Sequence, residues 1–354
     1  MTDEVITQID GQIGRIRLNR AKAIHALTRE MCSAMMAALV EWRENLEVKA
    51  VAIDHAEGRG FCAGGDVRML AESGATDGSE ARAFFHEEYR LNHLLFTYVK
   101  PSVAFMDGIT MGGGVGISQP CKYRVATENT RFAMPETSIG LFPDVGGGWY
   151  LSRLPGRVGQ FLALTGARLD GAECHHLGLA THYIPQEALD QVKRQISAEP
   201  ERIEGILEAA SVTPPEPKIA ANLASINRNF ASDRFEEVLD ALERDGSDWA
   251  QKELATLRAK SPQACKVSLR LLSDGANMAD FADEMRQEYA VAAKVVQRAD
   301  FNEGVRAVLI DKDNAPRWNP ATPEGVTDHM IDTIFAPMPH GEEWTPLSTD
   351  GASR

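Results

Sequence analysis

The sequence predicts an α/β fold that begins as a layered core and ends as a set of helices. Residues 5–18 form two alternating runs around Asp10 and Gly11, which is typical of a β-hairpin. A helical pattern follows Thr28, the expected N-cap, and leads to a short apolar strand. This strand–helix–strand order favours layered packing. From about residue 185 onward the apolar residues recur with the 3.6-residue spacing of helices.

The change of pattern divides the chain into two expected parts. We expect an α/β core over residues 1–198 and a helical region over residues 199–354 that covers one end of the core. The polar stretch 199–217 contains several prolines and is the expected boundary or hinge. We expect the residues after Pro320 to form a loosely held end.

The composition is that of an ordinary globular protein and excludes several functions. The chain has 354 residues, of which 44% are hydrophobic, and a formal net charge of −14, which opposes binding to nucleic acid. Its five scattered cysteines lack a C-x-x-C pair, so we expect reduced thiols and no zinc site. No apolar run approaches the length of a membrane span, and the first residues carry no targeting pattern. We therefore expect a cytoplasmic protein without membrane partners or a bound metal.

The stretch 103–150 carries the chemistry. A short apolar run at residues 103–106 predicts a buried strand, and the glycines at 112–114 lead into a small-residue segment that could start a helix. Glycines at a helix N-terminus expose free N–H groups to a ligand. The spacing does not match a dinucleotide fingerprint or a P-loop. The remaining use of such N–H groups is to hold an oxyanion as it forms.

Two acids accompany two glycine runs in this stretch. Glu136 follows a proline at an expected strand end, and Asp144 precedes the glycines at 146–148. Apolar surroundings raise the pKa of a carboxyl group and suit it to acid–base or nucleophilic work. The alternative is that both glycine runs are tight turns and that Glu136 caps a helix. The combination of both runs with both acids favours a functional site.

An earlier loop, residues 58–66, is also rich in glycine. It ends in Asp66, which could cap a helix that begins near Val67. The loop could also supply a second set of free N–H groups to the same site.

Three strings in the chain, DGITMGGGVG, AMPET and GLFPDVGGG, resemble the crotonase (enoyl-CoA hydratase/isomerase) superfamily. Within it the sequence resembles the 3-hydroxyisobutyryl-CoA hydrolase family over about residues 5–320. The resemblance implies a crotonase-like (ClpP/crotonase) spiral core of ββα units with a helical C-terminal region. It also implies that the N–H groups of Gly65 and Gly113 hold the thioester oxyanion.

The resemblance implies further contacts with the substrate. The loop containing Phe61, Ala63, Gly64 and Asp66 would run along the CoA moiety. Glu88, in an EEY motif, would contact the substrate, although two adjacent acids on a helix usually form a solvated face. Lys266, Arg270 and Lys312 are candidates to meet the CoA phosphates.

The implied reaction is hydrolysis of 3-hydroxyisobutyryl-CoA to 3-hydroxyisobutyrate and CoA, a step of valine breakdown. Glu136 would act as a nucleophile through an anhydride or as a general base on water, and the sequence does not separate these. Asp144, with or without Glu88, would bind the 3-hydroxyl group. We expect no cofactor, because CoA is part of the substrate.

Two alternatives stay open. One is an enoyl-CoA hydratase or isomerase that uses Glu136 alone, which is disfavoured because the hydratase pattern has its other acid where this chain has Gly116. A non-catalytic CoA-binding scaffold is disfavoured by the intact acids and glycine runs. The acyl group, which could also be 3-hydroxypropionyl, and a possible homo-oligomer are not decided by the sequence.

Overall fold

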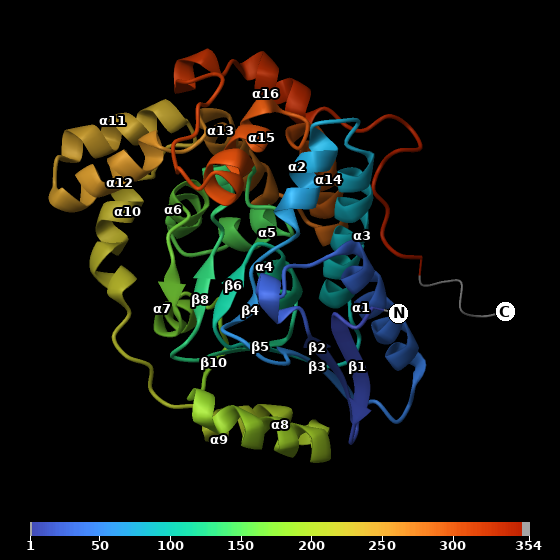
Figure 1. Ribbon diagram of the computed structural model, residues 1–354. Coiled ribbons are helices and arrows are strands. Elements are labelled where there is room, and N and C mark those ends of the chain that lie inside the picture. The colour runs from blue at the N-terminus through green and yellow to red at the C-terminus, as the bar shows by residue number, and fades with distance from the viewer. Residues whose placement is uncertain (1, 349–354) are drawn as a thin grey trace.

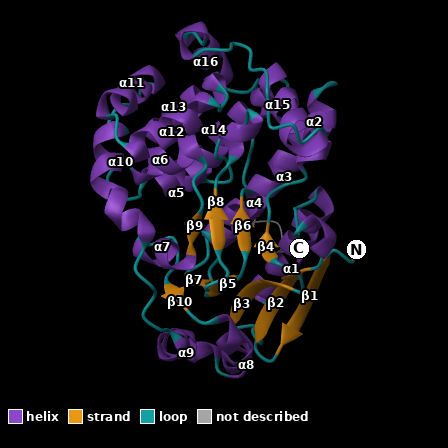
Figure 2. Cartoon of the chain, turned by 60° about the vertical axis from the view of Figure 1, so that its left-hand side comes forward, coloured by secondary structure: helices purple, strands orange, loops and turns teal. Residues whose placement is uncertain are grey.

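The computed structural model describes residues 2–348 and contains two β-sheets set beneath a cover of helices (Figures 1 and 2). The six-stranded sheet has the order β1-β2-β3-β5-β7-β10, and the four-stranded sheet has the order β4-β6-β8-β9. The strands are β1 (Val5–Asp10), β2 (Ile13–Leu18), β3 (Ala50–His55), β4 (Gly60–Cys62), β5 (Ser102–Met106), β6 (Ile109–Met111), β7 (Tyr123–Ala126), β8 (Arg131–Ala133), β9 (Leu169–Asp170) and β10 (His182–Tyr183).

The predicted hairpin is confirmed, since β1 and β2 are antiparallel with Val5 opposite Leu18. From β2 onward the large sheet is parallel, and parallel neighbours need crossover connections. Strands β4, β6 and β8 form a second parallel layer, and they lie side by side in Figure 2. The chain alternates between the two sheets, so that each of the glycine loops leaves the end of a strand in the small sheet.

The helices fall into groups that follow the chain. The α-helices are α1 (Arg29–Glu44), α2 (Val67–Gly74), α3 (Ser79–Phe96), α4 (Gly113–Ser118), α5 (Gly147–Ser152), α6 (Val158–Thr165), α7 (Gly171–His176), α8 (Leu189–Ala198), α9 (Ile203–Ala210), α10 (Leu223–Asn229), α11 (Phe235–Asp245), α12 (Asp248–Arg258), α13 (Pro262–Gly275), α14 (Phe281–Val295), α15 (Ala299–Val305) and α16 (Asp328–Phe335). A 3-10 turn, η2 (Glu136–Ile139), and a π-helical turn, η6 (Arg306–Ile310), also border the site.

Two predicted helix caps are confirmed. The hydroxyl group of Thr28 accepts a hydrogen bond from the N–H of Met31 and begins α1. The carboxylate of Asp66 accepts one from the N–H of Met69 and begins α2. Each cap satisfies an N–H group that has no partner within its own helix.

Helices α8 and α9 pack together against one face of the six-stranded sheet, at the bottom of Figure 1. Ile203, Ile206 and Leu207 of α9 are buried in the same apolar cluster as Val103 and Phe105 of β5. Helix α9, which follows the expected boundary at residue 198, therefore packs against the same sheet as α8, and the division of the chain at that residue stays a prediction.

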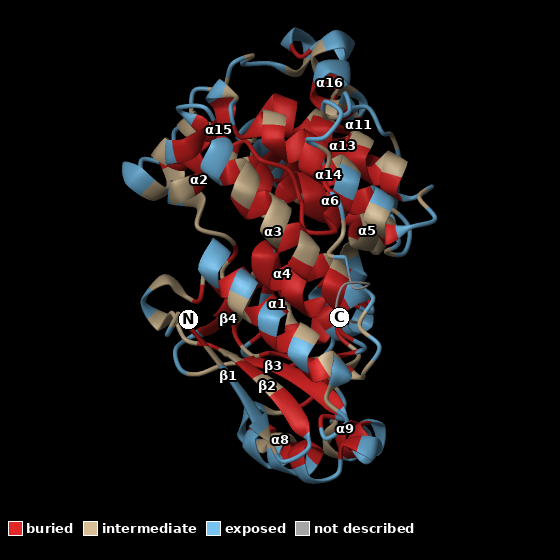
Figure 3. Ribbon diagram, turned by 90° about the vertical axis from the view of Figure 1, so that its right-hand side faces the viewer, coloured by how far each residue is buried: buried red, intermediate tan, exposed pale blue. Residues whose placement is uncertain are grey.

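The helices from α11 to α16 cover the opposite end of the molecule. One apolar cluster runs from the sheets through α3 and α4 to α13 and α14, and Figure 3 shows this continuous buried interior in red. The expectation of a loose end after Pro320 is wrong for residues 321–348, because Ile334 and Trp344 are fully buried, and the last six residues lie outside the described part of the chain. The indole N–H of Trp344 also donates to the carbonyl oxygen of His86. No helix within residues 2–348 is both long and apolar enough to cross a bilayer.

Candidate active site

A cavity of about 450 Å³ lies where the glycine loops, α3, η2 and the turn of η6 converge. Its lining includes most of the residues that the sequence singled out, together with a segment from far along the chain. The residues are Ala63, Gly64, Gly65, Val67, Leu70, Phe84, Phe85, Glu88, Met111, Gly112, Gly113, Pro135, Glu136, Ser138, Ile139, Leu141, Asp144, Val145, Arg168, Val308, Leu309 and Asn314.

The two glycine loops face each other across this cavity. A methyl group added to Gly64 would lie 3.9 Å from the backbone nitrogen of Gly113, so the loops are within van der Waals reach. The first loop is fixed by Leu27, whose N–H donates to the Gly64 carbonyl over 2.7 Å. Among the described residues, no acceptor takes the N–H of Gly65 or of Gly113. Both groups are therefore free to bind a developing oxyanion.

Glycine is required at these positions because two acids lie against the second loop. A methyl group at Gly113 would come within 2.6 Å of Glu88 Oε1. One at Gly112 would come within 3.2 Å of Glu136 Oε1. The second loop therefore presents its backbone directly to both carboxyl groups.

Three carboxyl groups are buried in the cavity wall. The exposed fractions of Glu88, Glu136 and Asp144 are 2%, 6% and 5%. Glu88 Oε1 and Glu136 Oε2 have no hydrogen-bond partner within residues 2–348. A buried polar atom without a partner is costly, and in a cavity wall such an atom indicates that a ligand could supply the missing hydrogen bond.

The environment shifts the pKa of each of these acids upward. Burial raises the pKa of Glu136 well above its ordinary value, and the charge of Asp144 raises it further. Burial also raises the pKa of Glu88, and the charges of Asp144 and Glu136 raise it further. Burial also raises the pKa of Asp144, to about 6, against the opposing effect of a hydrogen bond from Tyr89. Strongly perturbed acids in one cleft are typical of a catalytic site.

Local structure explains why Glu88, and not Glu87, faces the cavity. Glu88 lies on the buried face of α3 with Phe84 and Phe85, which also line the cavity. Glu87 lies one position earlier and accepts a hydrogen bond from the hydroxyl group of Ser33 on α1. The 3.6-residue period therefore gives the two adjacent acids different surroundings.

The sequence did not single out Tyr89. Its hydroxyl group donates to Asp144 Oδ2 over 2.8 Å, and its side chain is fully buried. A buried tyrosine needs a partner for its O–H. Its position directly after Glu88 on the apolar face of α3 was the available signal.

The second glycine run has a different role from the first. The N–H groups of Gly146 and Gly148 donate to the carboxylate of Glu288 on α14, over 2.8 and 3.2 Å. They are therefore not available as oxyanion donors, and the run belongs to the turn that carries Asp144. A methyl group at Gly148 would collide with Glu284, so close packing against α14 requires glycine there.

The predicted CoA loop is only partly at the cavity. Ala63 and Gly64 line it, together with Gly65. Phe61 is fully buried in β4, and its side chain is not part of the lining. The carboxylate of Asp66 caps α2 and forms an ion pair of 2.9 Å with Arg20, so it is engaged elsewhere.

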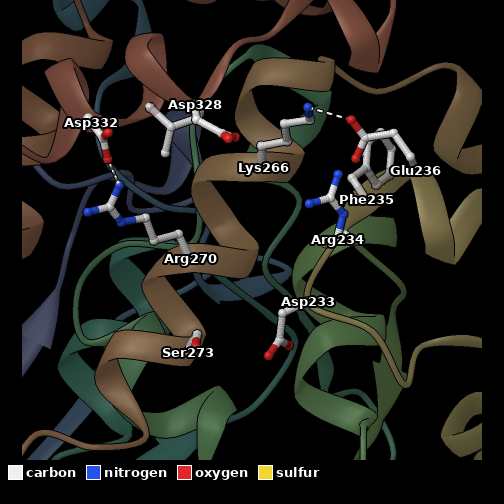
Figure 4. A pocket seen from close by; sticks show the side chains of 10 residues that line it. Asp233, Arg234, Phe235, Glu236, Lys266, Arg270, Ser273, Asp328 and Asp332 are labelled. Atoms are coloured by element: carbon white, nitrogen blue, oxygen red, sulfur yellow. Dashed lines mark hydrogen bonds and ion pairs between the residues drawn. The ribbon is translucent and has the colours of Figure 1, made fainter.

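Two of the three candidate phosphate ligands lie in another cavity. Lys266 and Arg270 line a hollow of about 320 Å³ between α11, α13 and α16 (Figure 4). There Lys266 pairs with Glu236 and Arg270 with Asp332, each over 2.6 Å. These cations are already neutralised, and they do not line the cavity that holds Glu136.

Lys312 is better placed than the other two. It is exposed and lies two residues before Asn314, which lines the mouth of the cavity. Arg168 is also exposed and is the one basic residue among the described residues that line the cavity. Arg168 was not predicted, because no motif surrounds it in the sequence.

Gly116 has no room for a side chain. A methyl group there would come within 2.6 Å of Val145 Cβ and 2.7 Å of Asn92 Nδ2. Both neighbours are fully or almost fully buried. An acid at this position would therefore need a different packing of α3 and of the turn after Asp144.

Comparison with known proteins agrees with the fold and with the cavity. The chain belongs to the enoyl-CoA hydratase/isomerase family, whose sequence model matches residues 13–335. Within that family it is similar to mitochondrial 3-hydroxyisobutyryl-CoA hydrolases. It is 41% identical to the hydrolase of Danio rerio over 344 residues, which cover 95% of this chain and 90% of the relative. It is 40% identical to that of Homo sapiens over 345 residues, 94% of this chain and 88% of the relative.

Solved structures confirm the crotonase-like fold. A carnitinyl-CoA dehydratase from Mycobacterium thermoresistibile superposes with a TM-score of 0.92 at 37% identity, covering 99% of this chain and all of that one. An enoyl-CoA hydratase from Rhodobacter sphaeroides superposes with a TM-score of 0.90 at 34% identity, covering 97% and 100%. The curated hydrolases are described as mitochondrial, so the cytoplasmic location expected from the sequence stays a prediction.

Proposed function

We propose that this protein hydrolyses 3-hydroxyisobutyryl-CoA to 3-hydroxyisobutyrate and CoA, as its curated relatives are named for doing. One observation carries the proposal. Glu136 has an unpartnered, buried carboxyl oxygen in the same cavity as the free N–H groups of Gly65 and Gly113. A carboxylate beside oxyanion donors is one arrangement that can hydrolyse a thioester.

In the proposed mechanism the two N–H groups bind the thioester oxygen as it gains charge. Glu136 acts as a carboxylate in one of two ways. As a nucleophile it bonds to the carbonyl carbon and expels the CoA thiolate, and water then cleaves the resulting anhydride and restores Glu136. As a general base it takes a proton from water, which attacks the carbonyl carbon, and the thiolate leaves with that proton.

Asp144 provides recognition of the 3-hydroxyl group. Tyr89 occupies one of its oxygens, Oδ2, which leaves Oδ1 to accept a hydrogen bond from the substrate. Glu88 lies beside Gly113, and burial raises its pKa, which favours the protonated form that can donate to a substrate oxygen. A site that hydrogen-bonds a substrate hydroxyl strongly rejects analogues that lack it.

Hydration of an enoyl thioester is the second candidate, because the two solved structures reported above are described as a dehydratase and a hydratase. Gly116 argues against it. The hydratase pattern needs a second acid at this position, and Val145 and Asn92 leave no space for one. The acids that the cavity does hold, Glu88 and Asp144, come from other positions.

The proposal is tested with two thioesters in parallel. Purified protein is mixed with 3-hydroxyisobutyryl-CoA and, separately, with crotonyl-CoA, while thiol release and loss of enoyl absorbance are followed. Thiol release from the hydroxyacyl ester with little change in crotonyl-CoA is the expected result. Loss of enoyl absorbance without thiol release would favour the hydratase, and silence in both assays, with CoA-ester binding intact, would favour a scaffold.

We also propose that the protein is cytoplasmic and, separately, that it forms a homo-oligomer. All five cysteines are buried and free, which is typical of a reducing compartment. Cell fractionation tests the location, and light scattering of the purified chain tests the oligomer.

Arg168 and Lys312, exposed near the cavity mouth, are proposed to meet the CoA phosphates.

A further inference from the structure

The turn that carries Asp144 has a strained backbone. Val145, the next residue, has a φ of 56°, and Gly146 has a φ of 92°. A β-branched residue at positive φ is a rare conformation that persists only when the surrounding structure enforces it. Val145 itself lines the cavity, so the strain lies at the site and not in a remote loop.

Glu288 enforces this turn from the side away from the cavity. Its Oε2 accepts the N–H of Gly146 over 2.8 Å, and its Oε1 accepts the N–H of Gly148 over 3.2 Å. Between them, the N–H of Gly147 donates to the carbonyl oxygen of Asp144 over 2.9 Å. The N–H of Gly147 thus bonds back to Asp144, and the two oxygens of Glu288 bind the N–H groups on either side of it.

Stability alone does not explain an acid at this position. Glu288 is fully buried, and no cation within residues 2–348 forms an ion pair with it. Glu284, one helical turn earlier, is also fully buried, and in the described part of the chain neither of its oxygens has a hydrogen-bond partner. An apolar residue at position 288 would leave the two buried N–H groups unpaired, but a neutral acceptor would cost less to bury than a carboxyl group.

We propose that Glu288 is a positioning residue that holds Asp144 against the substrate's 3-hydroxyl group and so sets the preference for hydroxylated acyl thioesters. The inference rests on the proposed function, in which Asp144 reads that hydroxyl group. Glu288 is not part of the cavity lining, and it acts through the turn at Val145 and Gly146.

The test compares Glu288→Gln with Glu284→Gln. Both replace a fully buried glutamate of α14 with its isostere, but Glu288 alone of the two bonds the turn. A glutamine at 288 keeps one acceptor and sets an NH2 group against the other backbone N–H. We expect kcat/KM for 3-hydroxyisobutyryl-CoA to fall about tenfold or more in Glu288→Gln, the scale of a lost hydrogen bond to a charged group. The rate on isobutyryl-CoA, which lacks the hydroxyl group, should change far less.

The selectivity ratio of Glu284→Gln should stay near that of the unsubstituted protein. A Glu288→Gln variant that slows equally on both thioesters would overturn the inference, because that is what a purely structural role predicts. An equal loss of selectivity in both variants would also overturn it, since the charge of the pair and not the bonds to the turn would then be responsible.

Hydrogen–deuterium exchange provides a readout that does not depend on the substrate. Peptides that span residues 144–150 should exchange faster in Glu288→Gln than in Glu284→Gln, and unchanged protection would overturn the inference. Failure of the proposed function would appear separately, as absence of thiol release by the unsubstituted protein. If Glu288→Gln does not fold, Glu288→Asp replaces it, since a shorter side chain cannot reach both N–H groups and should give an intermediate loss of selectivity.

Discussion

The hydroxyl group of Tyr89 donates a 2.8 Å hydrogen bond to Oδ2 of Asp144, and both side chains are shielded from water. The bond engages Oδ2, and Oδ1 is the oxygen to which the proposed function assigns the substrate hydroxyl group. It also opposes the effect of burial on the pKa of Asp144, which is raised to about 6. A hydrogen bond in a buried setting is stronger than one in water, so removal of this bond should have a large effect on Asp144.

The first prediction concerns Tyr89→Phe. Removing the hydroxyl group should lower kcat/KM for 3-hydroxyisobutyryl-CoA by about tenfold, because Asp144 loses a hydrogen bond to a charged group. Isobutyryl-CoA should be affected less. Tyr98→Phe is the matched control, since its hydroxyl group donates to the carbonyl of Leu39, away from the cavity. Equal effects of the two substitutions on thiol release would contradict the assignment of Tyr89.

The same substitution should change the pH dependence. The bond from Tyr89 lowers the pKa of Asp144, so its loss should raise that pKa further above its present value of about 6. An ionised Asp144 is the better acceptor for the substrate hydroxyl. The acidic limb of the kcat/KM profile for the hydroxyacyl ester should therefore move to higher pH in Tyr89→Phe. An unmoved limb would mean that Asp144 does not control it.

The third prediction concerns Glu136→Gln. The substitution should lower kcat by about 10²- to 10⁴-fold, the usual range for loss of an acid–base group, while calorimetric binding of the CoA ester persists. Glu87→Gln is the control, because Glu87 is an acid of α3 that bonds Ser33 and lies outside the cavity. A Glu136→Gln protein that keeps near-full turnover would rule out Glu136 as nucleophile or base.

The raised pKa of Glu136 predicts the form of the pH–rate profile in the unsubstituted protein. Burial, and then the charge of Asp144, stabilise the protonated form, whereas both proposed roles need the carboxylate. The rate of thiol release should thus increase as the pH rises through the raised pKa of Glu136 and fall at lower pH. Stopped assays of kcat between pH 5 and 9 would reveal it, and a flat profile would argue against a buried carboxylate base.

Sequence reasoning captured the parts of the site that are local in the chain. The hairpin, the caps at Thr28 and Asp66, and the glycine loop that opens α4 each depend on a few neighbouring residues. Glu88 was harder, because an EEY pair on a helix has the same local pattern whether it faces solvent or a cavity. The resemblance, and not the helical period, selected it, and the structure places it in the cavity wall.

The parts that could not be predicted depend on contacts between distant segments. Glu288 lies 142 positions after Gly146 and 140 positions after Gly148 in the sequence, so no local pattern links it to the glycines that it bonds. Lys266 and Arg270 have ordinary helical surroundings in the sequence, and only packing shows that they meet Glu236 and Asp332 instead of the catalytic cavity. The burial of Trp344 likewise depends on α3, far earlier in the chain.

A further prediction tests the glycine loop at residues 112–114. Gly113→Ala should abolish most of the activity, since its methyl group would lie 2.6 Å from Glu88 Oε1 and 3.0 Å from Leu27 Cδ1. Loss of a single oxyanion donor costs about 2.7–4 kcal/mol of transition-state stabilisation, or about 10²- to 10³-fold in kcat. Gly205→Ala is the control, because no atom lies within 4 Å of its added methyl group in α9. That variant should be fully active and slightly more stable, since alanine favours the helix.

The last prediction concerns stability and rests on the second buried acid of α14. Burial raises the pKa of Glu284 from its ordinary value of 4.5 to about 7, so the folded protein holds this proton more tightly than the unfolded chain does. Its contribution to the free energy of unfolding is therefore complete below about pH 4.5 and is lost as the pH rises through about 7. The contribution is on the order of 3 kcal/mol, from 1.36 kcal/mol for each unit of pKa shift.

Urea unfolding at pH 5 and pH 8 measures this contribution directly. The free energy of unfolding should fall between the two values by more in the unsubstituted protein than in Glu284→Gln, which has no group to titrate at that position. The charge of Glu284 also raises the pKa of Glu288, so the difference between the two declines reports the titration of this pair. Equal declines would mean that Glu284 binds no extra proton in the folded state, and the cost of burying it beside Glu288 would then have to be met by other contacts in α13 and α14.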